Sequence, residues 1–308
     1  MTHASAPGKI ILFGEHAVVY GRPALAVPVT QVHADVDVSD SPRPGIWIEA
    51  PDVHLRAELN TLSSDHPIAS VIHNFLFLFR VSRFPNLAIK IISTIPVASG
   101  LGSGAAVTVA LTRALAAHLN YAMADEEVNA FTYEIEKLHH GTPSGIDNTV
   151  VTYARPVYFV KGQPIETFQV GKPFTIVIAD TGIPAPTKES VGDVRRLWMN
   201  DRSRWETVFD KIGEISFTAR RAIEAGKPEL LGELMNENHA VLKTLTVSSP
   251  ELDKLVEAAH QAGALGAKLS GGGRGGNMIA LVESEHAGTV SRTLKEAGAR
   301  NTIRTQIL

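Results

Sequence analysis

One stretch decides how the rest of the sequence is interpreted: Pro96-Val97-Ala98-Ser99-Gly100-Leu101-Gly102-Ser103-Gly104-Ala105-Ala106. The residues before it, 87–94, alternate in the way of a half-buried strand. Residues 107–119, after it, are rich in alanine and leucine at helical spacing. A glycine-rich loop between a strand and a helix lets backbone N–H groups approach an anion, and the helix adds its positive end. The stretch therefore predicts a phosphate-binding loop.

The composition indicates an ordinary globular protein. The chain has 308 residues, 44% of them hydrophobic and 20% charged, with a net charge of −3 and no cysteine. This length favours about two domains, and the lack of cysteine excludes disulfides, thiolate metal sites and a cysteine nucleophile. No basic excess points to nucleic acid, and apolar runs such as 72–81 are shorter than the ~20 residues of a membrane span. Since the N-terminus has no signal-peptide pattern, we expect a cytoplasmic protein with no membrane or nucleic-acid partner.

The remaining sequence predicts a mixed α and β chain in two domains. A polar stretch around Gly171 precedes a new apolar strand, which gives the domains 1–171 and 172–308. Residues 39–45 hold two prolines and a glycine and are expected to form a hairpin loop. The expected strands are 9–14, 24–29, 32–38, 46–50, 87–94, 157–161, 174–179, 277–283 and 302–308. The expected helices are 68–79, 107–119, 125–138, 187–199, 204–225, 228–245, 251–262 and 286–297.

Two known phosphate-binding motifs match the opening stretch poorly. A Walker P-loop needs a lysine near its end, and none follows Gly104. Residues 100–105 match the Gly-x-Gly-x-x-Ala dinucleotide fingerprint, but residues 96–99 separate the first glycine from the strand. The acidic residue that should end the next strand is also missing, because Asp125 opens a helix instead. A nicotinamide cofactor and a plain glycine-rich turn stay open as alternatives.

A second stretch, residues 136–148, carries two carboxylates. Glu136 lies on the last turn of an expected helix, and Asp147 follows eleven residues later across a Pro/Gly turn. Near bound phosphates, one carboxylate would hold Mg²⁺ and the other would accept a proton from an attacking hydroxyl. The alternative, of equal weight, is a solvent-facing Glu136 and an Asp147 that caps a turn. His139 and His140 are interpreted as helix-end histidines, because no further ligand spacing supports a metal site.

Two further segments carry candidate functional residues. Residues 271–276 hold five glycines in six positions, and such a run costs conformational entropy that a mere connector need not incur. We expect this loop to close over a nucleotide or substrate, with a flexible turn as the alternative. Near the N-terminus, Lys9 begins a buried strand and needs a carboxylate or phosphate partner. Glu15 and His16 follow at the far end of that strand.

Together these segments resemble the GHMP kinase superfamily, the small-molecule kinases named for galactose, homoserine, mevalonate and phosphomevalonate. Residues 6–21 are similar to the first motif of the superfamily, 96–106 to the second and 268–276 to the third. Within the superfamily, residues 136–148 and 180–188 are similar to the mevalonate kinases. The resemblance spans nearly the whole chain.

The resemblance implies an α+β fold, with an N-terminal domain like ribosomal protein S5 domain 2 and a ferredoxin-like C-terminal domain. It implies a kinase that uses ATP and Mg²⁺ to phosphorylate the 5-hydroxyl of (R)-mevalonate in isoprenoid biosynthesis. The nearest alternative is a sibling kinase acting on the 3-hydroxyl of mevalonate, on phosphomevalonate or on a sugar. A nicotinamide-dependent oxidoreductase and a non-catalytic nucleotide-binding relative are the others. The expected partners are mevalonate and ATP, with the chain as a homodimer.

The resemblance also implies roles for the residues at matching positions. Asp147 corresponds to the catalytic carboxylate, and Lys9 to the lysine that keeps it ionised and stabilises the attacking oxygen. Glu136 corresponds to the Mg²⁺ carboxylate, and Ser103 is the candidate second metal ligand, in place of the serine that the family carries at position 104. The residues expected to hold ATP are Pro96, Ser99, Gly100, Leu101, Gly102, Ser103, Gly104 and Ala105. The residues expected to face or close over the substrate are Glu15, His16, Thr187, Lys188 and Gly272.

Two positions depart from the superfamily pattern. The second motif usually carries a serine where this chain has Gly104, and that serine is a metal ligand in mevalonate kinases. A direct hydroxyl–Mg²⁺ bond is therefore lost there, and Ser103 or a water would substitute. The third motif usually carries a glycine where this chain has Arg274. That arginine is either a surface residue or a positive charge for the phosphates.

Overall fold

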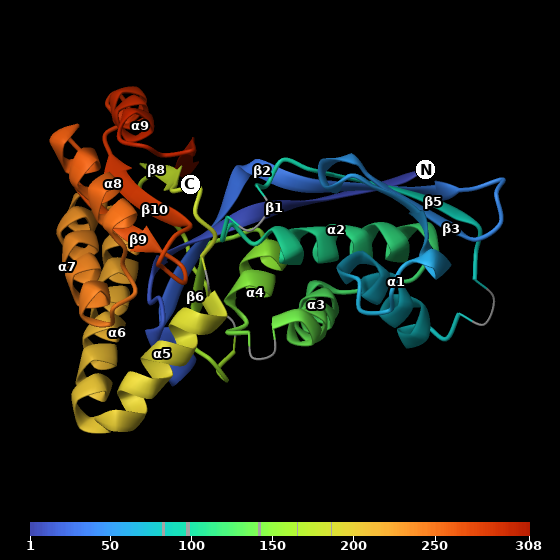
Figure 1. Cartoon of the computed structure of the whole chain (residues 1–308), viewed down its shortest axis with the longest axis horizontal. Helices are drawn as coiled ribbons and strands as arrows, with labels where there is room; N and C mark the ends of the chain where they lie inside the picture. Colours follow the sequence, from blue (N-terminus) through green and yellow to red (C-terminus); the bar gives the residue numbers. More distant parts are fainter. Residues whose placement is uncertain (82–83, 97–98, 141–142, 165, 186) are drawn as a thin grey trace. The chain divides into compact units, whose positions relative to one another are not determined.

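A computed structural model describes residues 1–81, 84–96, 99–140, 143–164, 166–185 and 187–308 (Figure 1). Parts of three predicted motifs, at 97–98, 141–142 and 186, lie outside these described residues. The chain forms two compact units. Unit 1 holds residues 1–8, 32–97 and 102–154, and unit 2 holds 9–31, 98–101 and 155–308. Unit 2 thus includes a segment of the first predicted domain, and the division at residue 171 stays a prediction.

Two long strands, β1 (Thr2–Phe13) and β2 (Ala24–Asp40), contribute residues to both units. The expected start of the first strand at Lys9 is wrong, because the strand already includes Pro7. Among the described strand pairs β1 pairs with β2 alone, and a proline at such an edge costs no ladder hydrogen bond. The two strands expected at 24–29 and 32–38 are one, and Pro28 lies between the β2 residues that pair with β6 and those that pair with β5.

The sheet of unit 1 also contains β3 (Ile46–Ala50), β4 (Leu55–Glu58) and β5 (Leu87–Ser93). Strand β5 lies between β2, its antiparallel neighbour, and β3, its parallel neighbour. The prediction of a hairpin at residues 39–45 is therefore wrong, since β2 and β3 do not pair there. Strand β4, which pairs with β3, escaped prediction because its side chains are half-buried or exposed and show no apolar alternation.

One face of this sheet is covered by helices α1 (Pro67–Leu78), α2 (Ser103–His118), α3 (Asp125–His140) and α4 (Ile146–Tyr153) (Figure 1). Helix α2 packs against β5 and against the other three helices, so its alanine-rich sequence is buried on most sides. It begins at Ser103, four residues before the expected start, and the last four residues of the opening stretch form its first turn. Helix α4 was not expected.

In unit 2, a second sheet contains β8 (Phe174–Asp180), β9 (Gly266–Ser270), β10 (Asn277–Val282) and β11 (Asn301–Ile307). The strands lie in the order β11-β8-β10-β9 with antiparallel pairing, as in a ferredoxin-like domain. The helices of unit 2 are α5 (Thr187–Asn200), α6 (Arg202–Glu224), α7 (Leu231–Thr244), α8 (Pro250–Gln261) and α9 (Ala287–Glu296). Short strands β6 (Val157–Phe159) and β7 (Glu166–Thr167) extend from the first part of β2.

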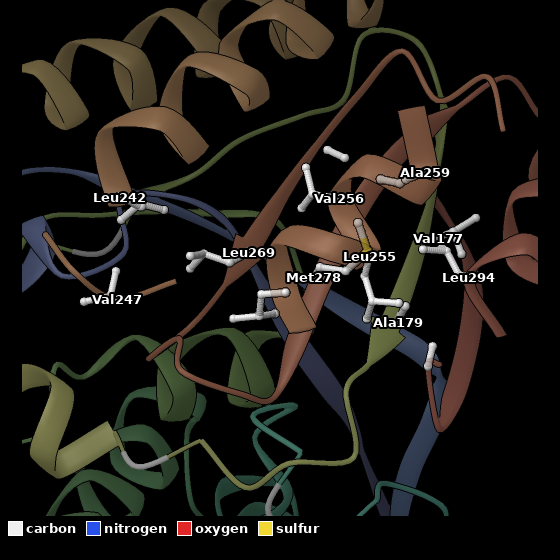
Figure 2. Close-up of a cluster of buried hydrophobic side chains, with 14 of the residues drawn as sticks. Val177, Ala179, Leu242, Val247, Leu255, Val256, Ala259, Leu269, Met278 and Leu294 are labelled. Carbon is white, nitrogen blue, oxygen red and sulfur yellow. The ribbon is translucent and has the colours of Figure 1, made fainter. Parts of the chain in front are cut away.

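The core of unit 2 lies between its sheet and helices (Figure 2). Leu269 of β9 and Met278 of β10 are opposite one another in register and fully buried. Leu255 of α8 and Leu294 of α9 complete the same cluster. This core fixes the ends of β9 and β10, and therefore the glycine-rich loop that joins them. No helix in the described part of the chain is long and apolar enough to cross a membrane.

Candidate active site

Residues 99–101 of the glycine-rich stretch belong to unit 2, where two strands hold them. The backbone N–H of Lys9 on β1 donates to the Leu101 carbonyl at 2.9 Å, and the Asn277 side chain at the start of β10 donates to the Ser99 carbonyl. Gly100, between them, is exposed and has a φ of 78°, a left-handed conformation that favours glycine. The loop therefore offers an accessible backbone in a fixed conformation, as an anion cradle requires.

In unit 1, helix α2 begins at Ser103 after Gly102, whose φ is 74°. Among the described residues no side chain caps this end, so the first N–H groups of this 16-residue helix have no side-chain acceptor there. Their partial positive charge and the exposed, side-chain-free Gly104 suit a phosphate group. Pro96 and Ser103 are half-buried in this unit, and Ala105 is buried.

Glu136 of α3 lies beside the first turn of α2. A Cβ built on Gly104 would lie 3.4 Å from its Oε1, an ordinary contact distance. Glu136 is only 8% exposed, so the alternative of a solvent-facing side chain is wrong. Among the described residues no three His, Cys, Asp or Glu side chains gather as a metal cluster. A single buried carboxylate beside a helix N-terminus is compatible with Mg²⁺, which is commonly held by one or two carboxylates together with phosphate oxygens and waters.

Asp147 lies in the first turn of α4, where a carboxylate interacts favourably with the helix N-terminus. The helix begins one residue earlier, after Gly145, so Asp147 lies on a helix that the sequence did not predict and not on the turn before it. The next residue, Asn148, is buried and donates to the Asn129 side chain of α3 at 2.6 Å. This amide pair fixes the turn that carries Asp147, and the sequence reasoning missed it. His139 contacts Ser70 at 3.0 Å, in keeping with a structural role at the end of α3.

Unit 2 contains a buried ion pair that the sequence reasoning also missed. Lys268 of β9 donates to Glu15 and, at 2.6 Å, to the Leu269 carbonyl, and neither charged side chain reaches solvent. Burial raises the pKa of Glu15 against the attraction of Lys268 and Lys9, and burial lowers the pKa of Lys268. A lysine inside a continuously apolar strand was a signal, because such a charge needs a partner.

His16 follows Glu15 with a φ of 61° and is also buried. Its Nε2 lies 3.1 Å from the Gly272 carbonyl oxygen, so we assign the ring proton to this nitrogen. Burial lowers the pKa of His16 to about 4, which makes the ring neutral at pH 7. Its Nδ1 is then an acceptor, and this atom and Glu15 Oε2 have no hydrogen-bond partner among the described residues.

The remaining predicted substrate residues lie at the start of α5. Thr187 and Lys188 are exposed, and a Cβ built on Gly272 would lie 2.7 Å from the Thr187 Oγ1. The structure thus brings Gly272, Thr187 and His16 together in unit 2. Lys9 is 4% exposed, and its charge acts on Glu15.

Comparisons with known proteins identify the family to which the chain belongs. The family descriptions "GHMP kinases N terminal domain" and "GHMP kinases C terminal" match residues 68–155 and 219–300. The chain is 36% identical to a mevalonate kinase of Pyrococcus abyssi over 312 residues, which cover 96% of this chain and 92% of that protein. It is 31% identical to a mevalonate kinase of Saccharolobus solfataricus, covering 97% and 98% of the two chains. The chain belongs to the mevalonate kinase family of GHMP kinases.

Solved structures agree with membership of the mevalonate kinase family. The crystal structure of L. major mevalonate kinase in complex with R-mevalonate superposes with a TM-score of 0.85 at 29% identity, covering 100% of this chain and 96% of that chain. A phosphomevalonate kinase from Streptococcus pneumoniae has a TM-score of 0.83 at 18% identity, a likeness of fold alone. The α+β GHMP kinase fold is confirmed, and the chain is an ATP-dependent kinase. The nicotinamide-dependent oxidoreductase is thereby set aside.

Proposed function

We propose that the chain transfers the γ-phosphoryl group of ATP to the 5-hydroxyl of (R)-mevalonate. The observation that carries the proposal is the identity of 36% to a mevalonate kinase along 96% of the chain. An exposed, uncapped helix N-terminus with a neighbouring buried carboxylate supports it, because phosphoryl transfer relies on positioning and charge stabilisation.

Asp147 and Lys9 are the proposed catalytic residues. The 5-oxygen of mevalonate forms a bond to the γ-phosphorus while the bond from that phosphorus to the bridging oxygen of ADP breaks. Asp147 orients the hydroxyl or accepts its proton. Lys9 keeps that carboxylate ionised and stabilises the developing negative charge on the attacking oxygen. This assignment rests on the match of both positions to the family motifs.

ATP is proposed to bind at residues 99–105, where its phosphates accept hydrogen bonds from backbone N–H groups. Glu136 would hold Mg²⁺, with Ser103 as a second ligand. When bound, the metal neutralises phosphate charge. Glu15, His16 and Gly272 would face mevalonate, with Thr187 and Lys188 closing over it. A neutral His16 supports this role, since its Nδ1, which has no partner among the described residues, can accept a hydrogen bond from a substrate hydroxyl.

The test is an assay of ADP release in which mevalonate, phosphomevalonate, homoserine and galactose are offered in parallel. We expect turnover with mevalonate far above the other three, and ³¹P NMR of the product should show a phosphomonoester on the 5-oxygen. Absence of turnover with mevalonate would refute the proposal, and a product phosphorylated on the 3-oxygen would replace it by the sibling reaction. We further propose that the protein is a cytoplasmic homodimer. Light scattering after size-exclusion chromatography would measure the molar mass and so test the dimer.

A further inference from the structure

The loop 271–276 between β9 and β10 is enclosed by two other segments of unit 2. A Cβ built on Gly273 would collide with the Val247 carbonyl, and one on Gly275 would lie 2.6 Å from the Ile183 carbonyl oxygen. The backbone N–H of Gly276 donates to that Ile183 carbonyl at 2.8 Å. The loop therefore lies against the segment before α5 on one side and the segment after α7 on the other.

Arg274 is the one residue of this loop that is not a glycine. Its Nη1 donates to Asp193 of α5 at 2.5 Å, and its Nε donates to the Thr246 carbonyl at 3.1 Å. Arg274 and Thr246 both have a φ of 58°, a left-handed conformation that costs energy for residues with a Cβ. Such backbone persists only where surrounding contacts hold it. The backbone N–H of Arg274 donates to the Val247 carbonyl at 2.8 Å, and the guanidinium adds the contacts to Thr246 and to Asp193 of α5.

We propose that Arg274 is a positioning residue for the substrate side of the site. By joining Asp193 of α5 to Thr246 after α7, it fixes the loop whose Gly272 carbonyl holds the imidazole of His16. The inference rests on the proposed function, in which His16 faces mevalonate.

The contact between His16 and Gly272 makes this coupling specific. The His16 Nε2 lies 3.1 Å from the Gly272 carbonyl, only two residues from Arg274 along the loop. A shift of that carbonyl turns the ring and displaces Nδ1, the atom left to accept from a ligand. The positive charge of Arg274 also helps to lower the pKa of His16, so it favours the neutral ring that can act as an acceptor.

The neighbours of Arg274 argue against a direct role on the phosphates of ATP. Asp193 balances its charge, and three of its nitrogens already donate to Asp193 or Thr246. A residue that bound phosphate would change the KM for ATP when it is removed. A residue that acts through Gly272 and His16 would change the KM for mevalonate.

The experiment measures kcat and both KM values for Arg274→Gly, Asp193→Asn and the double variant. Glycine is the usual family residue at position 274 and adopts the left-handed backbone without strain, so this variant is expected to fold. We expect the KM for mevalonate to rise about 3- to 10-fold in each single variant, the double variant to be no worse than either, and the KM for ATP to stay within about 2-fold. Arg196→Gln is the matched control, because Arg196 also pairs with Asp193 but is 74% exposed, and it should resemble the wild type.

Three outcomes overturn the inference. One is an unchanged KM for mevalonate in Arg274→Gly and Asp193→Asn, and another is a rise in the KM for ATP instead. The third is a rise in the KM for mevalonate in Arg196→Gln as large as that in Arg274→Gly. That result would attribute the rise to the loss of any partner of Asp193 and not to Arg274. If the wild type does not phosphorylate mevalonate, the proposed function fails, and this inference fails with it. If the wild type is active but the variants have the same KM for mevalonate, only this inference fails.

Discussion

Replacing Lys268 by methionine tests whether the buried ion pair supports unit 2. Lys268 and Glu15 have no exposed side-chain surface, so the variant leaves a carboxylate buried without its counter-ion. Removing one partner of such a pair costs about 3–5 kcal/mol, whereas a whole domain is stable by only about 5–15 kcal/mol. We therefore expect the free energy of unfolding to fall by about a fifth or more.

Unfolding in urea, followed by tryptophan fluorescence to which the buried Trp205 in the core of unit 2 contributes, measures this loss. The double variant Lys268→Met with Glu15→Gln removes both charges, and its loss should be well below the sum of the two single losses. Lys243→Met is the control, because Lys243 pairs with Asp253 but is 49% exposed, and it should cost less than about 1 kcal/mol. A loss of less than about 1 kcal/mol in Lys268→Met, or additive single losses, would refute the reasoning.

Three further predictions concern the proposed catalytic carboxylate, the proposed metal site and pH. Asp147→Asn should lower kcat by about 10²- to 10⁴-fold, while the affinity for ATP measured by calorimetry stays unchanged. Loss of ATP binding with normal turnover of the bound complex would instead give Asp147 a structural role. Gly104→Ser should stabilise α2 by about 0.5 kcal/mol and lower the Mg²⁺ concentration for half-maximal activity, because its hydroxyl lies beside Glu136; an unchanged Mg²⁺ titration would contradict this. Burial lowers the pKa of His239 to about 4, so the folded state binds fewer protons than the unfolded state between pH 4 and 6.5. The share of His239 in the free energy of unfolding should therefore drop by about 2 kcal/mol as the pH is lowered to 5. His239→Gln should remove this share from the pH dependence of the urea midpoint and leave the share of His16, whose pKa is also about 4.

The elements that the sequence predicts well are those with one strongly apolar face. Strand β3 was predicted at its observed bounds, and β5 and α8 within a residue at each end, because burial of one face imposes a clear period. Helix α1 was predicted as closely because its sequence is apolar at nearly every position. The short helix α4 was missed because its polar residues, such as Asn148, are buried through contacts that no periodicity reveals. The position of β5 between β2 and β3 depends on pairing between strands far apart in the chain, which no local pattern encodes.

The candidate site was predictable where backbone conformation alone matters. The glycines at 100 and 102 do adopt left-handed backbone, as a cradle before a helix requires. The partner of Glu15 was not predictable from its neighbourhood, since Lys268 lies 253 residues away in the sequence. The pairing of Arg274 with Asp193 was not predictable for the same reason, because these two charged residues are 81 positions apart and meet only in the folded chain.

The composition of unit 2 has a consequence for folding during synthesis. Its first segment, residues 9–31, carries Ala17 of the core and Arg22, which bonds to Asp210 at 2.8 Å. The bulk of the unit starts at residue 155, so 155 − 31 = 124 residues separate that start from the end of the segment. At about 5–20 residues per second, the ribosome needs on the order of 6–25 s to make this stretch. For at least that time the nascent segment lacks its partners from the bulk of unit 2, such as Asp210, although its parts of β1 and β2 can already pair with one another. The core of unit 2 therefore closes late in synthesis.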